Sequence, residues 1–124
     1  MTDPTARRVL ILDDERVIAN TLALILNRSG YEARAVYDAE AAIETAGELL
    51  PDILISDVFM EGMTGIDAAI RITQIVPKCR IILFSGQAGT ADLFERAEAK
   101  GHRFELLTKP VHPRVLLERL KAID

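Results

Sequence analysis

Short apolar runs alternate with longer segments of helical period along this chain. Apolar runs stand in four places, at 9–12, 53–56, 81–84 and 104–108, and a more polar segment at 32–36 has a weaker strand pattern. After each run, apolar residues recur every three or four positions, which is the spacing of one helical face. The pattern therefore predicts five repeats of a strand followed by a helix.

Local sequence signals mark the ends of the predicted helices. Asp38 and Thr90 are suited to cap helix N-termini. Thr64 and Asp67 have the form of a capping box in which Asp replaces the usual Glu. Pro113 suits the first turn of the last helix. Residues that can end a helix follow the first, third and fourth helical segments, namely Gly30, Pro77 and Gly101.

The strand pattern also indicates how the sheet is covered. Strands that are almost continuously apolar need both faces buried, as in a parallel sheet flanked by helices. Five strand–helix units are too few for an eight-stranded barrel. We therefore expect an α/β fold with an open, doubly wound parallel sheet and five helices. Such sheets bind ligands beyond the carboxyl ends of their strands, where the strand order reverses.

Reactive polar residues follow four of the apolar runs. They are, in chain order, Asp13 with Asp14, then Asp57, Ser85 and Lys109. A single aspartate after a strand often only caps a turn or a helix. Matching positions on four parallel strands would instead bring three carboxylates, a hydroxyl and an ammonium to one edge of the sheet.

This set of groups suits a divalent cation and a phosphoryl group. Three neighbouring carboxylates repel one another, and Mg²⁺ prefers such oxygen ligands. The ammonium of Lys109 can bind one phosphoryl oxygen, and the hydroxyl of Ser85 can donate to another. Asp57, the lone acid on the strand beside the acidic pair, is the best candidate for a nucleophile that forms an aspartyl phosphate.

In this order and spacing, the residues resemble the receiver domain of response regulators in two-component signalling. The resemblance extends from about Val9 to Ile123 and rests on the motifs Asp13–Asp14, Asp57, Ser85–Gly86 and Lys109–Pro110. It implies a flavodoxin-like fold with strand order 2-1-3-4-5, whose reversal lies between the first and third strands.

The resemblance also implies a role for each site residue. Asp57 would accept a phosphoryl group from the phosphohistidine of a histidine kinase. Asp14 and Asp57 would ligate Mg²⁺ directly, together with the backbone carbonyl of Phe59, and Asp13 would act largely through water. Ser85 and Lys109 would bind the phosphoryl group, and the bond from that lysine to the following proline is often cis in the family.

The implied partners are proteins. They are a sensor histidine kinase or a phosphotransfer protein, and an effector that binds the face made by the fourth helix, fifth strand and fifth helix. The mixed charges of that face favour a protein over DNA; they are Arg96, Glu98, Lys100, Glu105, Arg114 and Glu118. Basic residues cluster only at Arg7–Arg8, so we expect no nucleic acid and no membrane to bind this domain directly.

Two positions depart from the family pattern. Family members usually carry Tyr or Phe three residues before the lysine, where this chain has Leu106. Phe104 lies two residues earlier, on the same strand face but roughly 6–7 Å further from the site. The common Met-Pro pair after the phosphoacceptor is Met60–Glu61 here. We expect phosphoryl capture to be intact and the usual aromatic switch to be altered.

Length and composition indicate the number of domains and the cellular compartment. A chain of 124 residues with 49% hydrophobic residues and a formal charge of −4 fits one domain, for which we expect a flexible leader over 1–8 and a receiver domain over 9–124. A single cysteine, Cys79, excludes an internal disulfide and fits the cytoplasm. No effector domain follows Asp124 in this sequence, so we expect either a stand-alone receiver or part of a longer protein.

Two other functions are open to this residue pattern. A small Mg²⁺-dependent phosphatase that uses an aspartyl phosphate would need a second acid two residues after the nucleophile, where this chain has Phe59. A flavin-binding protein would need a Ser-, Thr- or Gly-rich phosphate loop after the first strand, where Asp13, Asp14 and Glu15 would repel the phosphate. We therefore expect a signalling module that catalyses only its own phosphorylation and dephosphorylation.

Overall fold

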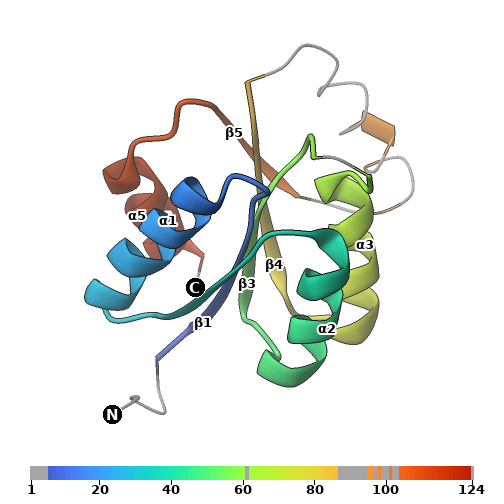
Figure 1. Cartoon of the computed structure of the whole chain (residues 1–124), viewed down its shortest axis with the longest axis horizontal. Coiled ribbons are helices and arrows are strands. Elements are labelled where there is room, and N and C mark those ends of the chain that lie inside the picture. The colour runs from blue at the N-terminus through green and yellow to red at the C-terminus, as the bar shows by residue number, and fades with distance from the viewer. Residues whose placement is uncertain are drawn as a thin grey trace.

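The protein is a three-layered α/β domain with a parallel sheet in the middle (Figure 1). The computed structural model describes residues 6–60, 62–86, 95, 96, 98, 101 and 104–123. The strands are β1 (Arg8–Leu12), β2 (Glu32–Val36), β3 (Ile53–Asp57), β4 (Arg80–Ser85) and β5 (Glu105–Thr108). The helices described are α1 (Arg16–Arg28), α2 (Ala39–Leu49), α3 (Gly65–Ile75) and α5 (Pro113–Ala122).

All neighbouring strands are parallel, in the order β2-β1-β3-β4-β5. Helices α1 and α5 cover one face of the sheet, and α2 and α3 cover the other (Figure 1). This arrangement confirms the doubly wound sheet and the strand order expected from the resemblance. None of the helices described is long and apolar enough to cross a membrane.

Alternation along each strand builds two separate cores. Val9 and Ile11 of β1 pack with α1 and α5, whereas Leu10 and Leu12 pack with α2 and α3. All four side chains are fully buried. A strand with two buried faces cannot show a polar alternation, which is why the runs in the sequence are almost continuously apolar.

The predicted caps hold the helices α2 and α3 at their N-termini. Asp38 accepts a hydrogen bond from the amide of Ala41 at 2.7 Å. Thr64 Oγ1 accepts from the amide of Asp67 at 3.2 Å, and the Thr64 hydroxyl donates to the Asp67 carboxylate at 3.1 Å. The carboxylate of Asp67 thus bonds the hydroxyl of Thr64, where a capping-box Glu would bond the backbone amide of the cap residue.

Helix α1 ends as the sequence indicates. Gly30 has φ +97°, the left-handed conformation that glycine adopts without steric cost. The amide of Gly30 donates to the carbonyl of Asn27 at 3.4 Å, and that of Tyr31 donates to Leu26 at 3.1 Å. These two bonds form a Schellman motif, which satisfies carbonyls in the last turn of the helix.

Several expectations concern residues that the structure does not describe. The predicted helix cap Thr90 lies outside the described residues, as does most of the fourth helix that was expected to follow it. Gly101, expected to end that helix, has φ +90°. Residues 1–5 of the expected leader also lie outside the described part, and β1 begins at Arg8.

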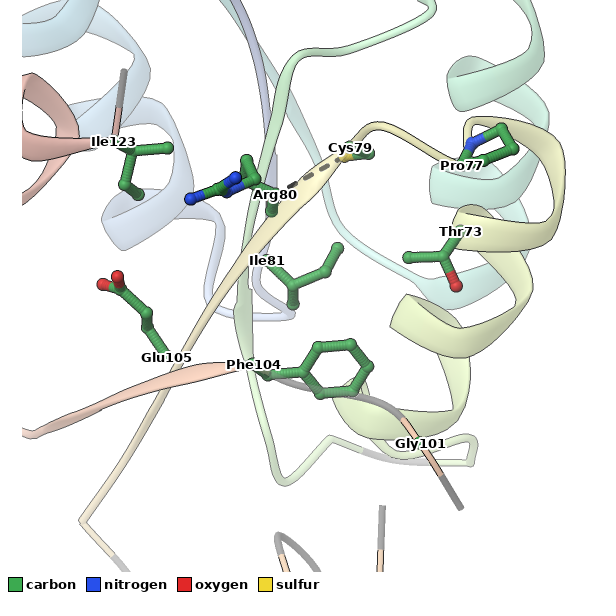
Figure 2. A pocket seen from close by; sticks show the side chains of 9 residues that line it. All are labelled: Thr73, Pro77, Cys79, Arg80, Ile81, Gly101, Phe104, Glu105 and Ile123. Carbon is green, nitrogen blue, oxygen red and sulfur yellow. Dashed lines mark hydrogen bonds between the residues drawn. The ribbon is translucent and has the colours of Figure 1, made fainter. Parts of the chain in front are cut away.

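A cavity of about 530 Å³ lies where β4 and β5 begin, at the edge of the sheet where the strands start (Figure 2). Phe104 lines it with its ring directed toward α3, and the side chain is only 8% exposed. Leu106, two residues further along, is 38% exposed. Phe104 is therefore anchored in the core beside α3 and far from the other edge, where the strands end.

Cys79 lines the same cavity, directly before β4, and is also buried. Burial raises the pKa of its thiol to about 12, and the charge of Asp52 adds to the effect. We therefore expect Cys79 to react very slowly with a thiol reagent at about pH 8, because the thiolate is the reactive form. Stopped-flow labelling checks this, with the protein unfolded in guanidinium as the fast control. Rapid labelling of the folded protein would contradict it.

The turn between β3 and α3 leaves no room for a side chain at Gly65. A Cβ placed on Gly65 would lie 1.9 Å from the carbonyl oxygen of Asp57 and 2.7 Å from Ser56 Oγ. The amide of Gly65 donates to the carbonyl of Val58 at 2.7 Å, and the Ser56 hydroxyl donates to the carbonyl of Asp57 at 2.9 Å. Close contact and hydrogen bonds at the start of α3 therefore fix the position of the backbone at Asp57.

We expect Gly65→Ala to lower the free energy of unfolding by about 1–3 kcal/mol, because the clash forces the backbone apart. Gly47→Ala is the matched control: Gly47 lies in α2 with open space around its Cα. There alanine should raise the free energy of unfolding by about 0.5–1 kcal/mol. Urea denaturation of both variants measures the difference, and equal effects would refute this view of the turn.

Candidate functional site

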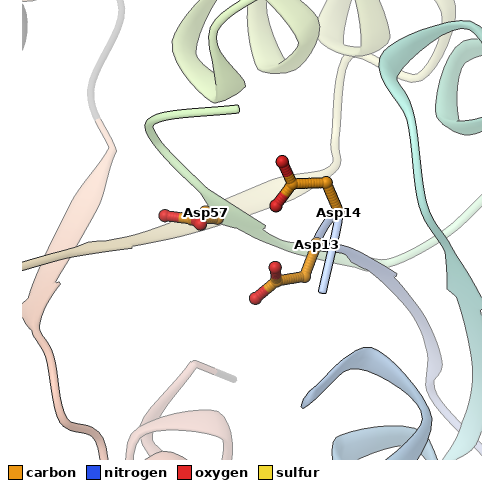
Figure 3. Close-up of side chains that lie close together, drawn as sticks. All are labelled: Asp13, Asp14 and Asp57. Carbon is orange, nitrogen blue, oxygen red and sulfur yellow. The ribbon is translucent and has the colours of Figure 1, made fainter. Parts of the chain in front are cut away.

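Three carboxylates meet at the edge of the sheet where β1 and β3 end. Asp13 and Asp14 follow β1, and Asp57 is the last residue of β3 (Figure 3). One oxygen from each residue lies within 4.8 Å of the others. Asp13 is fully buried and Asp57 is 7% exposed, whereas Asp14 is exposed to solvent. The structure thus brings together the three acids that the sequence placed at strand ends.

Asp13 is only partly satisfied in this cluster. One of its carboxylate oxygens accepts a hydrogen bond from the amide of Glu15 at 2.9 Å. The other, Oδ2, is buried and accepts no hydrogen bond from the residues that the structure describes. Burial raises the pKa of Asp13 above its usual value, and repulsion by Asp57 and Asp14 raises it further. The bond from Glu15 and the charge of Lys109 act in the opposite direction.

Lys109 supplies a positive charge directly at Asp57. Its Nζ lies 3.1 Å from Asp57 Oδ2, and the side chains are 28% and 10% exposed, respectively. The amide of Lys109 donates to the carbonyl of Ser85 at 3.1 Å, which ties the segment after β5 to the end of β4. The bond from Lys109 to Pro110 is cis, as the resemblance implied.

The remaining predicted residues lie at the same edge. Ser85 is the last residue of β4 and is 7% exposed. Phe59 follows β3 by two residues and is half-buried. Pairing of β3 with β4 sets Asp57 opposite Phe84, directly before Ser85. The six residues proposed from the sequence therefore all lie at or next to the carboxyl ends of β1, β3, β4 and β5.

Three further residues shape the site and were missed in the sequence. Ser56 and Gly65 hold the backbone of Asp57, and Phe84 lies beneath Lys109, with the ring centre 5.6 Å from Nζ. Ser56 is a lone polar residue in an apolar run, a signal that could have been used. Gly65 and Phe84 carry no such signal, because their importance depends on which backbone or side chain they contact.

The donor set fits a hard divalent cation. Among the described residues, three carboxyl groups lie together, and the ammonium of Lys109 is the positive charge paired with them. The unpaired Oδ2 of Asp13 is the kind of buried oxygen that such a cation satisfies. Neither a histidine nor a cysteine belongs to the acidic group found among the described residues, which argues for an oxygen-preferring ion rather than zinc.

Comparison with known proteins agrees with this geometry. The family model of the response regulator receiver domain matches residues 9–121. The chemotaxis protein CheY of Thermotoga maritima is 35% identical over 119 residues, which cover 95% of this chain and 98% of that protein. The DNA-binding response regulator MtrA of Mycobacterium tuberculosis is 27% identical over 97% of this chain but only 51% of its own length. This chain thus spans about half the length of MtrA.

Solved structures show the same fold. The chemotaxis protein CheY4 of Vibrio cholerae superposes with a TM-score of 0.83 at 27% sequence identity, over 97% of this chain and all of that one. A putative response regulator from Chloroflexus aurantiacus superposes with a TM-score of 0.80 at 30% identity, over 96% and 98% of the two chains. With its acidic cluster, its lysine and its strand order, this chain belongs to the family of response-regulator receiver domains of two-component systems.

Proposed function

We propose that this receiver domain accepts a phosphoryl group on Asp57 from the phosphohistidine of a sensor histidine kinase or a phosphotransfer protein. The observation that carries the proposal is the contact of 3.1 Å between Lys109 Nζ and Asp57 Oδ2, beside two more carboxylates. A carboxylate held next to an ammonium, at the edge where strands end, is placed to attack a phosphorus atom that Lys109 also attracts.

The transfer would form one bond and break one. An oxygen of Asp57 attacks phosphorus, and the bond from phosphorus to the donor's imidazole nitrogen breaks, which leaves a mixed anhydride on Asp57. Lys109 neutralises part of the charge on the phosphoryl oxygens, and the hydroxyl of Ser85 donates a hydrogen bond to another of them. Catalysis consists of positioning and charge stabilisation, as is usual for phosphoryl transfer.

Mg²⁺ is the cation that we propose for the acidic cluster. Asp14, Asp57 and the backbone carbonyl of Phe59 would hold it directly, and Asp13 would act largely through water. When bound, Mg²⁺ would offset negative charge on the phosphoryl oxygens. The unpaired, buried oxygen of Asp13 supports this assignment, because without a counter-charge it makes the cluster unfavourable.

We propose that phosphorylation of Asp57 changes the binding of this domain to a partner protein. We propose the cytoplasm as the place of phosphoryl transfer. The bound phosphoryl group would carry about −1.5 to −2 charges, as on other phosphoresidues. The carboxylate of Asp57 gives up its own charge when the anhydride forms, so the net change at the site is about −1 or less. The ends of β4 and β5 would respond first, because Ser85 and Lys109 bind the added group, and α5 follows Lys109 in the chain. A downstream effector would then bind to, or dissociate from, the face made by the fourth helix, β5 and α5.

Phe59 stands where a phosphatase would carry its second acid, so we do not propose turnover of other phosphate esters.

Phosphorylation tests the proposal directly. We expect acetyl phosphate with Mg²⁺ to add one phosphoryl group to the wild-type chain, seen by intact-mass spectrometry, and to add none to Asp57→Asn. Asp38→Asn is the matched control. It makes the same substitution after β2 at the same edge of the sheet, and Asn caps a helix as well as Asp does. Equal labelling of Asp57→Asn and wild type would exclude Asp57 as the acceptor.

Cation binding can be tested on the unphosphorylated protein. We expect millimolar Mg²⁺ to raise the Tm of the wild type, by an amount that grows with concentration because the ion binds only the folded state. Asp13→Asn should keep the bond from the Glu15 amide while removing one repelling charge. The variant should therefore be at least as stable as the wild type in EDTA and gain less from Mg²⁺.

The salt control for this experiment is NaCl at the same ionic strength, which should reproduce little of the stabilisation. Differential scanning fluorimetry or calorimetry measures all the Tm values. An identical Mg²⁺-dependent shift in the wild type and in Asp13→Asn would show that Asp13 does not contribute to binding the ion, and the absence of any shift in the wild type would exclude the site.

A further inference from the structure

Phe84 has no role of its own in the phosphoryl transfer proposed above, although it lies beside the reacting residues. It lies on β4 opposite Asp57, directly before Ser85, and is only 3% exposed. The Lys109 ammonium lies over its ring, 5.6 Å from the ring centre. The same ammonium is 3.1 Å from Asp57 Oδ2. Lys109 thus sits between an aromatic ring and the carboxylate that we propose as phosphoacceptor.

The surroundings of this pair are apolar on one side. Phe84 and Lys109 line a groove of about 460 Å³ beside α1 and α5. The other residues that line the groove are all apolar, namely Ile18, Leu22, Pro110, Val111 and Leu116. Among the described residues that line the groove, none has a side chain that could accept a hydrogen bond from the ammonium, and the carboxylates lie toward the end of the strands.

This environment restricts a side chain that is otherwise flexible. A lysine has a four-carbon stem, and ordering it costs rotamer entropy. The face of an aromatic ring attracts a cation within about 6 Å, and an apolar wall lowers the local dielectric, which strengthens the charge interaction on the other side. Both effects favour the conformation in which Nζ points at Asp57.

We propose that Phe84 is a positioning residue for phosphoryl transfer, whose ring holds the Lys109 ammonium in place at Asp57. The inference rests on the proposed function and adds a residue that acts only through Lys109. Leucine would fill much of the same volume and keep the site apolar, but it has no ring face to attract the cation. The aromatic character of residue 84, beyond its bulk, then contributes to the rate.

The experiment compares Phe84→Leu, Phe84→Tyr and Phe104→Leu with the wild type. Initial rates of phosphorylation by acetyl phosphate are measured at saturating Mg²⁺ and divided by the folded fraction. We expect Phe84→Leu to slow the reaction about two- to fivefold, and Phe84→Tyr to restore the rate because it keeps the ring. Phe104→Leu is the matched control, since it makes the same change in a buried Phe near the opposite edge of the sheet. It should leave the rate unchanged.

A double-mutant cycle separates positioning from packing. In a Lys109→Ala background, Phe84→Leu should have no further effect on the phosphorylation rate, because the group through which Phe84 acts is gone. A twofold to fivefold loss that persists in this background would overturn the proposal, as would a wild-type rate in Phe84→Leu.

A measurement without phosphorylation tests the contact itself. In NMR spectra, the ring current of Phe84 should shift the side-chain protons of Lys109, and Phe84→Leu should abolish that shift while Phe84→Tyr retains it. An unchanged Lys109 spectrum in Phe84→Leu would refute the contact. If instead the wild type takes no phosphoryl group from acetyl phosphate, the proposed function fails, and the NMR result still decides whether Phe84 holds Lys109.

Discussion

The register between β1 and β3 determines how close the acids of this domain lie. Leu12 pairs with Ser56, so the next residues, Asp13 and Asp57, leave the sheet at the same level on neighbouring strands. A shift of one residue would turn one of these carboxylates to the opposite face of the sheet. The register is in turn held by the apolar residues that precede the acids, since any shift would exchange the two cores. The packing of Val9 to Leu12 thus sets the geometry of the charged cluster.

The short distances between these carboxylates oppose folding, because the groups repel one another when they are charged. Two carboxylates about 4–5 Å apart repel by on the order of 3 kcal/mol at an effective dielectric near 20. A domain of this size is stable by only about 5–15 kcal/mol, so positive charges beside these acids matter to the stability of the fold. Lys109 supplies one of them at 3.1 Å from Asp57. Asp13 also has a buried oxygen that lacks a hydrogen-bond partner among the described residues, and a further positive charge nearby would stabilise it.

The sequence predicted those parts of the fold that depend on local chemistry. Strands β1, β3 and β4 followed from continuous apolar runs, whereas β2 contains Glu32 and Arg34. Asp38 and Thr64 cap helices through their side chains, and Gly30 ends α1 because it has none. The meeting of Asp13, Asp14 and Asp57 followed from the rule that parallel strands share a carboxyl edge. Gly65 and Phe84 could not be foreseen in this way. The first matters because it touches the carbonyl of Asp57, and the second because Lys109, which is distant in sequence, folds over it.

The positions of Leu106 and Phe104 limit how this domain can report a phosphoryl group. The nearest aromatic residue before Lys109 in the sequence is Phe104, which is 8% exposed and packed in the core beside α3. Removing a buried Phe side chain from a core costs about 3–5 kcal/mol. Coupling energies between sites are typically about 1–3 kcal/mol, so phosphorylation of Asp57 could not extract this ring. Leu106, 38% exposed and opposite Leu83 of β4, can change its surroundings at a lower cost than Phe104 because it is not buried in the core. Leu106 is an aliphatic side chain that is already at the surface. A movement of Leu106 can therefore alter the shape of a binding face, and no aromatic ring has to move between a buried and an exposed position.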